Sequence, residues 1–304
     1  WNLSGAWNVH EESFFKALQP TLSNLTLKAS YSLTADRGPA EVTNSQAIIR
    51  SFSPYRPFTD IQETGLYIDD IENSELTYEK KHELNIGAEI GFLNNRINLA
   101  VDWYKRDNYD LIGIINTKGT GGQLTKLANV ASMKSHGIEF TLSTQNIKKK
   151  DFSWNTDFIF SNTKNEVTDL QSNSSVIEMI SGSGFALEGY PVRSLFSMDF
   201  RGLNESGYPT FINEDGNLTV SNINFQERIK KGHLIYEGPT DPTITGSFGN
   251  SFKYKNFLLN LFITYSFGNV IRLDPVFHNQ YSDLDAMPRE FINRWTKGGD
   301  EKYT

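Results

Sequence analysis

The residues of this chain that could do chemistry are scattered, and none of them falls into a catalytic pattern. The sequence of 304 residues contains no cysteine, which excludes thiolate nucleophiles, thiolate metal sites and a disulfide scaffold. It has neither a Gly-x-Ser-x-Gly nor a His-Glu-x-x-His motif, and its five histidines lack metal-ligand spacing. A carboxylate pair for glycoside hydrolysis depends on spatial separation, which sequence does not give. We therefore predict no enzymatic activity, no cofactor and no metal site.

Polar residues on alternating stretches form the first set of candidate binding residues. Within 81–92 and 97–106, polar and apolar side chains follow one another with period two. Successive side chains of a strand point to opposite faces of a sheet, so the polar residues would share one face. There they could line a hydrated channel or contact a domain inside it, or they could be wall residues with no specific ligand. The candidates on these and three further stretches are Lys28, Glu83, Asn85, Glu89, Asn98, Asp102, Glu139 and Asp157.

Aromatic residues in the segments between these stretches form the second set. They could stack on sugar rings or grip a peptide, or they could be the small core that allows the segments to fold. We favour the core for the set as a whole, and we keep Tyr55, Tyr67 and Tyr190 as candidate substrate contacts. The set consists of Phe52, Tyr55, Phe58, Tyr67, Phe185, Tyr190 and Phe196.

Two acidic clusters resemble cation ligands in composition. The segment 69–72 (Asp-Asp-Ile-Glu) offers hard oxygen donors of the kind that bind divalent cations. The segment 213–217 (Asn-Glu-Asp-Gly-Asn) hints at a calcium loop but lacks the full ligand spacing of one. We interpret the first as part of a solvated acidic loop and the second as a turn. The segment 119–122 (Gly-Thr-Gly-Gly) is not a phosphate loop, because no Lys-Ser/Thr pair follows it.

The elements that must position these residues are β-strands. The clearest alternation places Ile97, Leu99 and Val101 on one face of a strand, and period two is the strand signal. Most stretches have roughly the 9–11 residues that a tilted strand needs to cross the hydrocarbon of a membrane. Aromatic residues near the stretch ends are typical of girdles at the two membrane interfaces. The predicted strands are 1–8, 25–34, 81–92, 97–106, 134–143, 152–162, 243–254 and 257–268.

The connections between the predicted strands alternate between short and long. This rhythm is typical of up-and-down outer-membrane barrels, which have tight periplasmic turns and long extracellular loops. We predict that 93–96, 144–151 and 255–256 are periplasmic. The predicted extracellular loops are 35–80, 107–133, 163–242 and 269–304.

Composition limits the remaining classes. There is no run of about 18 apolar residues, so we expect no transmembrane helix. The net charge of −7 and the isoelectric point of about 5.3 argue against a nucleic-acid partner. The chain opens on an alternating stretch without a signal peptide and closes without an apolar, aromatic-ended strand. We therefore expect a fragment that is cut at both ends.

Several sequence blocks resemble the SusC/RagA family of TonB-dependent outer-membrane transporters. They occur in order along nearly the whole chain, and the departures from the family pattern at 35–36 and 298–299 fall in loops. The blocks are Trp7–Phe15, Leu25–Ser32, Glu83–Gly87, Gly91–Leu99, Val101–Arg106, Ser135–Phe140, Trp154–Phe158, Gly189–Val192 with Phe196, Tyr254–Phe257 and Arg294–Glu301.

The resemblance implies an all-β fold, an antiparallel up-and-down transmembrane β-barrel wall with long extracellular loops. Residues 1–304 would supply about eight strands of a larger, plugged barrel of about 22 strands, and the plug domain and last strands would be absent. It also implies a Gram-negative outer-membrane location, contact with outer-membrane lipid, a SusD-like surface lipoprotein as partner, and TonB acting through the missing N-terminal region. The implied function is uptake of a bulky nutrient, an oligosaccharide by default or a peptide.

An alternative of a different class is a soluble all-β carbohydrate-binding or adhesin module, because antiparallel sandwiches also alternate. A sandwich buries its apolar face in a dry core, whereas a barrel turns that face to lipid. The rhythm of the connections and the aromatic girdles favour the barrel.

Overall fold

The chain forms two compact units. The computed structural model describes residues 1–19, 21–38, 46–55, 64–70, 72–119, 124–172, 174–182, 184–273, 280, 282 and 284–302. The first unit comprises residues 1–172, 188–190 and 243–267, and the second comprises 173–187, 191–242 and 268–304. Each unit is described below by itself.

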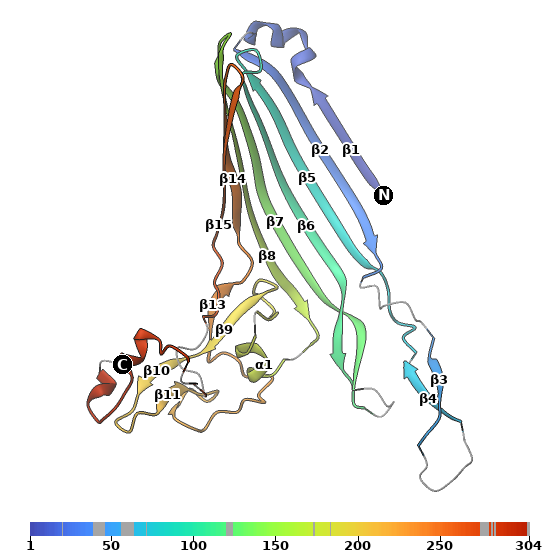
Figure 1. The fold of residues 1–304 in the computed structure, drawn as a ribbon. Coiled ribbons are helices and arrows are strands. Elements are labelled where there is room, and N and C mark those ends of the chain that lie inside the picture. The colour runs from blue at the N-terminus through green and yellow to red at the C-terminus, as the bar shows by residue number, and fades with distance from the viewer. Residues whose placement is uncertain are drawn as a thin grey trace. The chain divides into compact units, whose positions relative to one another are not determined.

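The first unit is built on one antiparallel sheet of eight strands, in the order β1-β2-β5-β6-β7-β8-β14-β15 (Figure 1). Every strand pairs with its sequence neighbour in the sheet, which is the up-and-down arrangement predicted from the sequence. All eight predicted strands are present. Their bounds are β1 Asn2–Asn8, β2 Leu22–Asp36, β5 Glu79–Phe92, β6 Ile97–Asn116, β7 Thr125–Lys148, β8 Phe152–Leu170, β14 Ile244–Tyr254 and β15 Phe257–Phe267.

The connections at one end of the sheet are short, and we call this the turn end. Residues 93–96, 149–151 and 255–256 form tight turns there, with positive φ angles at Leu93, Asn94, Asn95 and Lys255. The 3₁₀ helices η1 (Val9–Glu11) and η2 (Ser13–Leu18) join β1 to β2 at the same end, where the backbone N–H of Leu93 donates to the Thr21 carbonyl at 3.0 Å. At the opposite end, which we call the loop end, the connections between β2 and β5 and between β8 and β14 are long.

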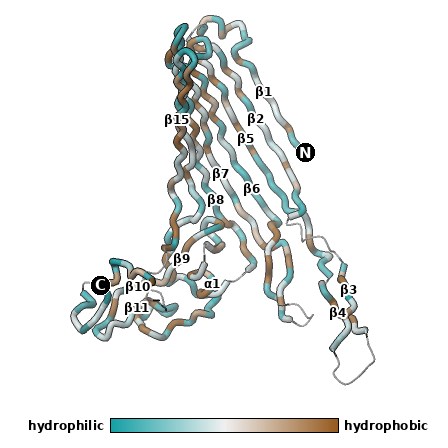
Figure 2. The backbone as a smooth tube through the Cα atoms, in the orientation of Figure 1, coloured by the Kyte–Doolittle hydropathy of each residue, from teal (hydrophilic) through white to brown (hydrophobic). Residues whose placement is uncertain are grey.

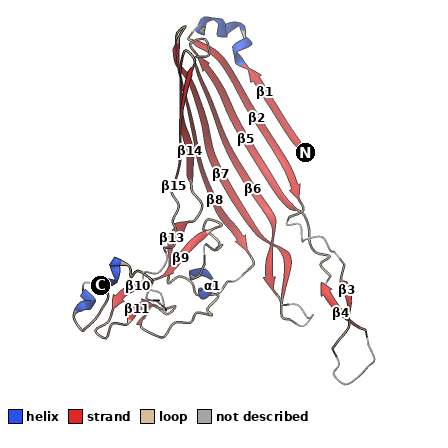
Figure 3. Cartoon of the chain, viewed as in Figure 1, coloured by secondary structure: helices blue, strands red, loops and turns tan. Residues whose placement is uncertain are grey.

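Three connections are shorter than the sequence predicted, because β6, β7 and β8 continue past the expected ends (Figure 3). The predicted loop 107–133 is largely a hairpin of β6 and β7, and only 117–124 connects them. The pairing of β6 with β7 bulges between Asn108 and Leu111, where Asp110 has a φ of 57° and accepts from the Lys80 ammonium at 2.6 Å. The bulge accommodates the positive φ angle of Asp110, which a regular strand excludes. The pairing of β6 with β7 therefore continues beyond it.

The other strands and helices lie in the segments predicted as loops. β3 and β4 pair as a hairpin within 35–80, and Phe58 of that segment lies outside the described residues. The second unit contains two small sheets, β10-β11-β12 and β13-β9. No helix among the described residues is long and apolar enough to cross a bilayer. The bounds are β3 Ile48–Phe52, β4 Gly65–Asp70, α1 Val176–Ile180, β9 Ser194–Met198, β10 Phe200–Leu203, β11 Pro209–Ile212, β12 Leu218–Thr219, β13 Leu234–Pro239, η3 Arg289–Asn293 and η4 Asp300–Lys302.

The register of the large sheet separates two faces, and hydrophobic and hydrophilic residues alternate along its strands (Figure 2). We call the face that carries Asn85, Asp102 and Glu139 the polar face. The opposite face, which carries Ile86, Trp103 and Ile138, is the apolar face. The apolar face is not covered within the described chain: Ile86 is 49% exposed and Ile263 is 62% exposed. A soluble sheet would bury such a face, so its exposure fits a wall that meets lipid.

Buried residues are few in the wall and gather elsewhere. Phe15 is fully buried in the 3₁₀ segment at the turn end. In the second unit, Val176, Met179 and Phe196 form a small core around α1 and β9. The sheet is therefore held mainly by its hydrogen-bonded ladders and by contacts across its two faces.

Candidate functional site

The five candidate residues on β5 and β6 lie together on the polar face, as predicted. Asn85 pairs directly with Tyr104, and Gly91 pairs with Asn98 on the same face. The same face continues on the next two strands, β7 and β8, through the residues that pair with these positions. The five are Glu83, Asn85, Glu89, Asn98 and Asp102.

The two glutamates of β5 are held in ion pairs. The Glu89 carboxylate pairs with the Lys28 ammonium of β2, and both side chains are nearly half exposed. Glu83 accepts from Lys81 at 2.8 Å and from Arg106 at 3.2 Å, and its side chain is 18% exposed. Both carboxylates are therefore partly neutralised by neighbours on the sheet itself.

Asp102 lies in a different electrostatic environment. It has no hydrogen bond or ion pair within the described part of the chain, and its direct partner on β7 is Glu139. Like charges that oppose each other across strands repel. The carboxylate leans across Gly87, where an added Cβ would lie 2.2 Å from Asp102 Oδ1. A glycine at this position is therefore what allows the acid to lie flat against β5.

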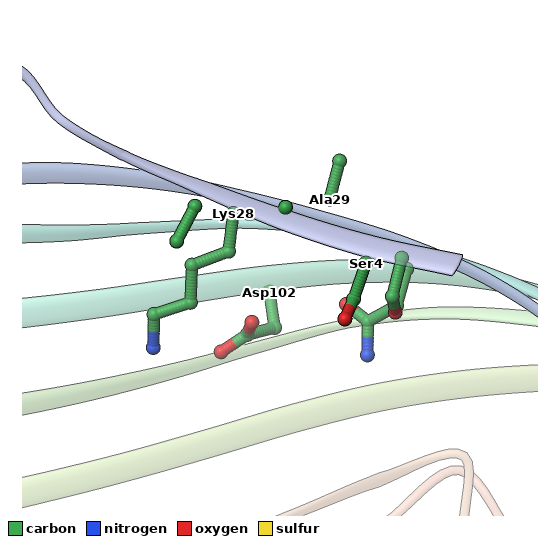
Figure 4. A pocket seen from close by; sticks show the side chains of 8 residues that line it. Ser4, Lys28, Ala29 and Asp102 are labelled. Atoms are coloured by element: carbon green, nitrogen blue, oxygen red, sulfur yellow. The ribbon is translucent and has the colours of Figure 1, made fainter. Parts of the chain in front are cut away.

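A cavity of about 370 Å³ opens beside Asp102 on the polar face. Figure 4 shows Ser4, Lys28 and Asp102 on one side of the strands and Ala29 on the other. Asn85 and Ser30 also line the cavity. The site thus presents an ammonium, a carboxylate, an amide and two hydroxyls, which together can donate to and accept from a polar solute.

A second cavity of about 420 Å³ lies nearer the turn end of the polar face. Asn98 lines it together with Ser143, Asn155 and Asp157. The Ser143 hydroxyl donates to Asp157 Oδ1 at 2.7 Å, which satisfies one oxygen of that carboxylate. The candidates on β6 are therefore divided between two hollows, with Asp102 in one and Asn98 in the other.

Sequence reasoning missed a buried tyrosine of this face. Tyr104 is 4% exposed and lies across Gly137, its direct partner on β7. The Tyr104 hydroxyl is 2.6 Å from the hydroxyl of Thr163 on β8, and the Arg106 guanidinium stacks 4.1 Å from the centre of its ring. The signal that was available is a tyrosine at a polar position of the alternation; its glycine partner is visible only once the register is known.

The three aromatic candidates are not brought to these cavities. Tyr55 follows β3 and is 90% exposed. Tyr67 on β4 packs edge-on against Phe52, with ring centres 5.7 Å apart. The Tyr190 carbonyl accepts from the backbone N–H of Val167 at 2.9 Å, which ties its segment to β8. Tyr67 thus contacts an aromatic ring of its own hairpin while both side chains stay nearly half exposed, and none of the three lines either cavity.

The acidic clusters have local roles. Asp69 pairs with Arg50 at 2.6 Å, whereas Ile71 lies outside the described residues. The segment 213–217 is a turn, as predicted: Asn213 is 1% exposed, and its side-chain oxygen accepts from the backbone N–H of Asn217 at 2.9 Å. No group of three or more potential metal ligands occurs among the described residues.

Two carboxylates of the second unit accept hydrogen bonds from nearby backbone. The backbone N–H and hydroxyl of Ser175 donate to Glu178 at 2.6 and 2.8 Å, and they hold the pKa of Glu178 below its usual range. Glu227 accepts from the N–H groups of Ile229 and Lys230, which lower its pKa in the same way. These charges serve the fold of the unit.

Comparison with known proteins gives one consistent family. The family model described as "TonB dependent receptor-like, beta-barrel" matches residues 1–282. TonB-dependent receptor P3 of Formosa agariphila is 26% identical over 306 residues, which cover 96% of this chain and 30% of the relative. TonB-dependent receptor SusC of Bacteroides thetaiotaomicron is 25% identical over 296 residues, which cover 90% of this chain and 28% of SusC.

Solved structures agree on the fold. A structure of the RagAB peptide transporter superposes with a TM-score of 0.76 at 24% identity, covering 100% of this chain and 33% of that one. A structure of the RagAB peptide importer in the "closed-closed" state superposes with a TM-score of 0.70 at 25% identity, covering 88% and 29%. The chain therefore spans about a third of the length of the proteins that it matches.

Proposed function

The chain belongs to the TonB-dependent receptor β-barrel family, and on that premise we propose that the whole protein imports a bulky polar nutrient across the outer membrane. Members of this family lie in the outer membrane of Gram-negative bacteria, and this chain supplies part of the barrel wall. The family match and the uncovered apolar face exclude the soluble sandwich that the alternation had left open.

The polar face lines the lumen in this proposal. The observation that carries it is the division of the same strands into a face with hydroxyls, amides and ion pairs and a face with exposed Ile, Leu and Phe. A barrel in lipid turns the apolar side outward and keeps its polar side toward water. The Asp102 cavity and the Asn98 cavity would then be hollows of the channel wall.

The turn end faces the periplasm and the loop end faces outward in this proposal, since such barrels have short periplasmic turns. The sequence contains no cysteine, so single cysteines can be introduced without a background signal from this region. Gly232→Cys in the second unit should react with a membrane-impermeant maleimide on intact cells, and Asn256→Cys in the β14–β15 turn should react only after lysis. The reverse pattern would overturn the orientation.

The partners and the cargo are further parts of the proposal. A SusD-like surface lipoprotein would cap the loops, and TonB would act through a region outside this chain. We propose an oligosaccharide as the cargo, because amides, hydroxyls and carboxylates are suitable partners for sugar hydroxyls. The likeness to RagAB, a peptide transporter, makes a peptide the second candidate.

The test is uptake by cells that carry the whole receptor. Asp102→Ala should slow uptake of the cargo, because it removes the unpaired acid of the cavity that Asp102 lines. Asp107→Ala is the matched control: Asp107 lies on the same strand but on the apolar face, and it is exposed.

Growth on defined oligosaccharides and on peptides as sole nutrients identifies the cargo. Equal uptake by all variants would remove Asp102 from the proposed path, and loss of neither nutrient on gene deletion would overturn the import function.

A further inference from the structure

A row of basic side chains crosses the apolar face near the loop end. Lys105 of β6 pairs directly with His136 of β7, and His136 pairs directly with Lys164 of β8. All three side chains are exposed. Neighbouring strands lie about 4.8 Å apart, so the three side chains start from adjacent points on one face. We call these residues the basic rung.

The basic rung lies immediately above the apolar part of its face. The next rung toward the turn end contains Trp103 and Ile138, which are 38% and 41% exposed. Trp is enriched at the level where hydrocarbon meets the headgroups, and lysine stems cover apolar surface while the ammonium stays in water. Along this face toward the loop end, the apolar residues therefore come first and the cationic residues follow them.

The next rung of the same face toward the loop end contains anionic side chains. Asp107, Lys134 and Glu166 oppose one another there. Lys134 pairs with Glu166 at 3.2 Å, and Asp107 is 3.6 Å from the Lys105 ammonium. These acids compensate Lys134 and part of Lys105. Lys164 and His136 have no ion pair or hydrogen bond within the described residues. The basic rung therefore keeps a net positive charge directly next to the apolar residues Trp103 and Ile138.

Toward the turn end, the same face contains a rung without charged side chains. This rung contains Thr144, which lies eight residues along β7 from His136. At roughly 3.3 Å per residue the separation is about 26 Å, which is similar to the height of about 25 Å of the apolar band of an outer-membrane barrel. There the Trp154 indole N–H and the Thr156 hydroxyl donate to Asn250 Oδ1 at 2.8 and 2.7 Å. The rung consists of Ile97, Thr144, Thr156, Asn250 and Leu261.

We propose that Lys105, His136 and Lys164 bind the phosphate groups of the anionic glycolipid in the outer leaflet of the outer membrane. The inference rests on the proposed orientation, which places the basic rung in that leaflet and the neutral rung nearer the other. Lys105 and Lys164 flank His136 on the two neighbouring strands, so a phosphate bound between them would compensate both ammonium charges. Lysine ammonium and imidazole N–H groups are the donors that a phosphate oxygen accepts from.

The test measures binding of lipid A with two phosphates to the whole receptor, purified in nonionic detergent and stripped of lipid. The double variant K105Q/K164Q should bind about 25-fold more weakly, at about fivefold per lysine near an anionic surface. K105R/K164R should bind like the wild type, because the charges remain. The matched control K149Q/K150Q removes two lysines from the turn end and should leave the affinity unchanged. All variants are first checked for a heat-modifiable band, which reports the folded barrel.

Three results would overturn the site: equal affinity of K105Q/K164Q and wild type, an equal loss in the turn variant, or equal binding of lipid A without phosphates. Displacement of lipid A by inorganic phosphate alone would replace the lipid by a free anion and overturn the assignment as well. The measurement in detergent does not depend on orientation. A failure of orientation is seen instead in the cysteine labelling, so the two failures are distinguishable.

Discussion

Both faces of the sheet contain a glycine that is covered by a tyrosine of the neighbouring strand, although the surroundings of the two tyrosines differ. On the polar face Tyr104 covers its direct partner Gly137, and on the apolar face Tyr265 covers its direct partner Gly246. In both places an added Cβ would lie within 2.6 Å of the tyrosine ring or hydroxyl. A glycine in a strand leaves a gap over the backbone, and a cross-strand aromatic ring fills it.

What differs between the faces is the partner of each hydroxyl. Tyr104 reaches the Thr163 side chain at 2.6 Å among charged neighbours, whereas Tyr265 donates to the backbone carbonyl of Ile159 at 2.9 Å. Around Tyr265 the contacts are aromatic, with Phe158 at 6.2 Å and Phe267 at 5.7 Å between ring centres. Both faces thus share the glycine–tyrosine pair, and only the residues around the tyrosine differ, polar and charged on one face and aromatic on the other.

The largest expected effect comes from placing a charge on either side of one strand. Ile263 and Thr264 are adjacent on β15 and point to opposite faces. Ile263→Arg should lower the free energy of unfolding by about 2–4 kcal/mol, the cost of Arg at the middle of a lipid-facing surface. Thr264→Arg should change it by less than about 1 kcal/mol. Chemical unfolding of the whole receptor in lipid vesicles measures both, and equal losses would break the distinction between the faces.

The covered glycine of the polar face gives the next effect. Gly137→Val places atoms within 2.6 Å of the Asn162 carbonyl and of Tyr104, so it should destabilise the barrel by roughly 1–3 kcal/mol through overpacking. Tyr104→Phe keeps the ring and removes only the hydroxyl, and it should cost about 1 kcal/mol. The midpoint of denaturant unfolding orders the two. A Gly137→Val variant as stable as wild type would mean that Tyr104 moves away freely.

The ion pair between Lys28 and Glu89 should contribute less. Both side chains are nearly half exposed, so their coupling should be about 0.2–1 kcal/mol. Lys28→Glu and Glu89→Lys should each weaken the barrel, and the double exchange should restore most of the loss. The double-mutant cycle on unfolding free energies gives the coupling. A double variant as unstable as the sum of the single ones would show that the pair does not interact.

The smallest effect concerns a charge held by local backbone instead of by a neighbouring strand. The pKa of Glu178 is lowered by the Ser175 hydrogen bonds, so its contribution to folding is present above the ordinary glutamate pKa and is lost as pH falls through the lowered one. Glu178→Gln should make hydrogen exchange in 174–182 about two- to fivefold faster at about pH 7, and the difference should shrink as the pH falls below the ordinary glutamate pKa. A difference that persists in acid would contradict the carboxylate's role.

Much of the fold could be predicted from the sequence because period two is local. Every second residue of Ile97–Val101 is apolar, and this alone assigns faces and strand identity. The strand ends were predicted less well. Asp107, Asn108 and Asp110 have the types of turn residues, yet the ladder continues through a bulge there, since pairing with β7 outweighs their local preference.

The alternation of side chains along each strand assigns residues to faces, so the sequence was enough to place five polar candidates on one surface: Glu83, Asn85, Glu89, Asn98 and Asp102. Which of these residues meet depends on how the strands pair in the folded sheet. Register between strands sets that Asp102 opposes Glu139, that Tyr104 covers Gly137 and that Lys105, His136 and Lys164 share a rung. These partners are 28 or more residues apart in sequence, and a register shift would exchange them all while leaving every local pattern unchanged.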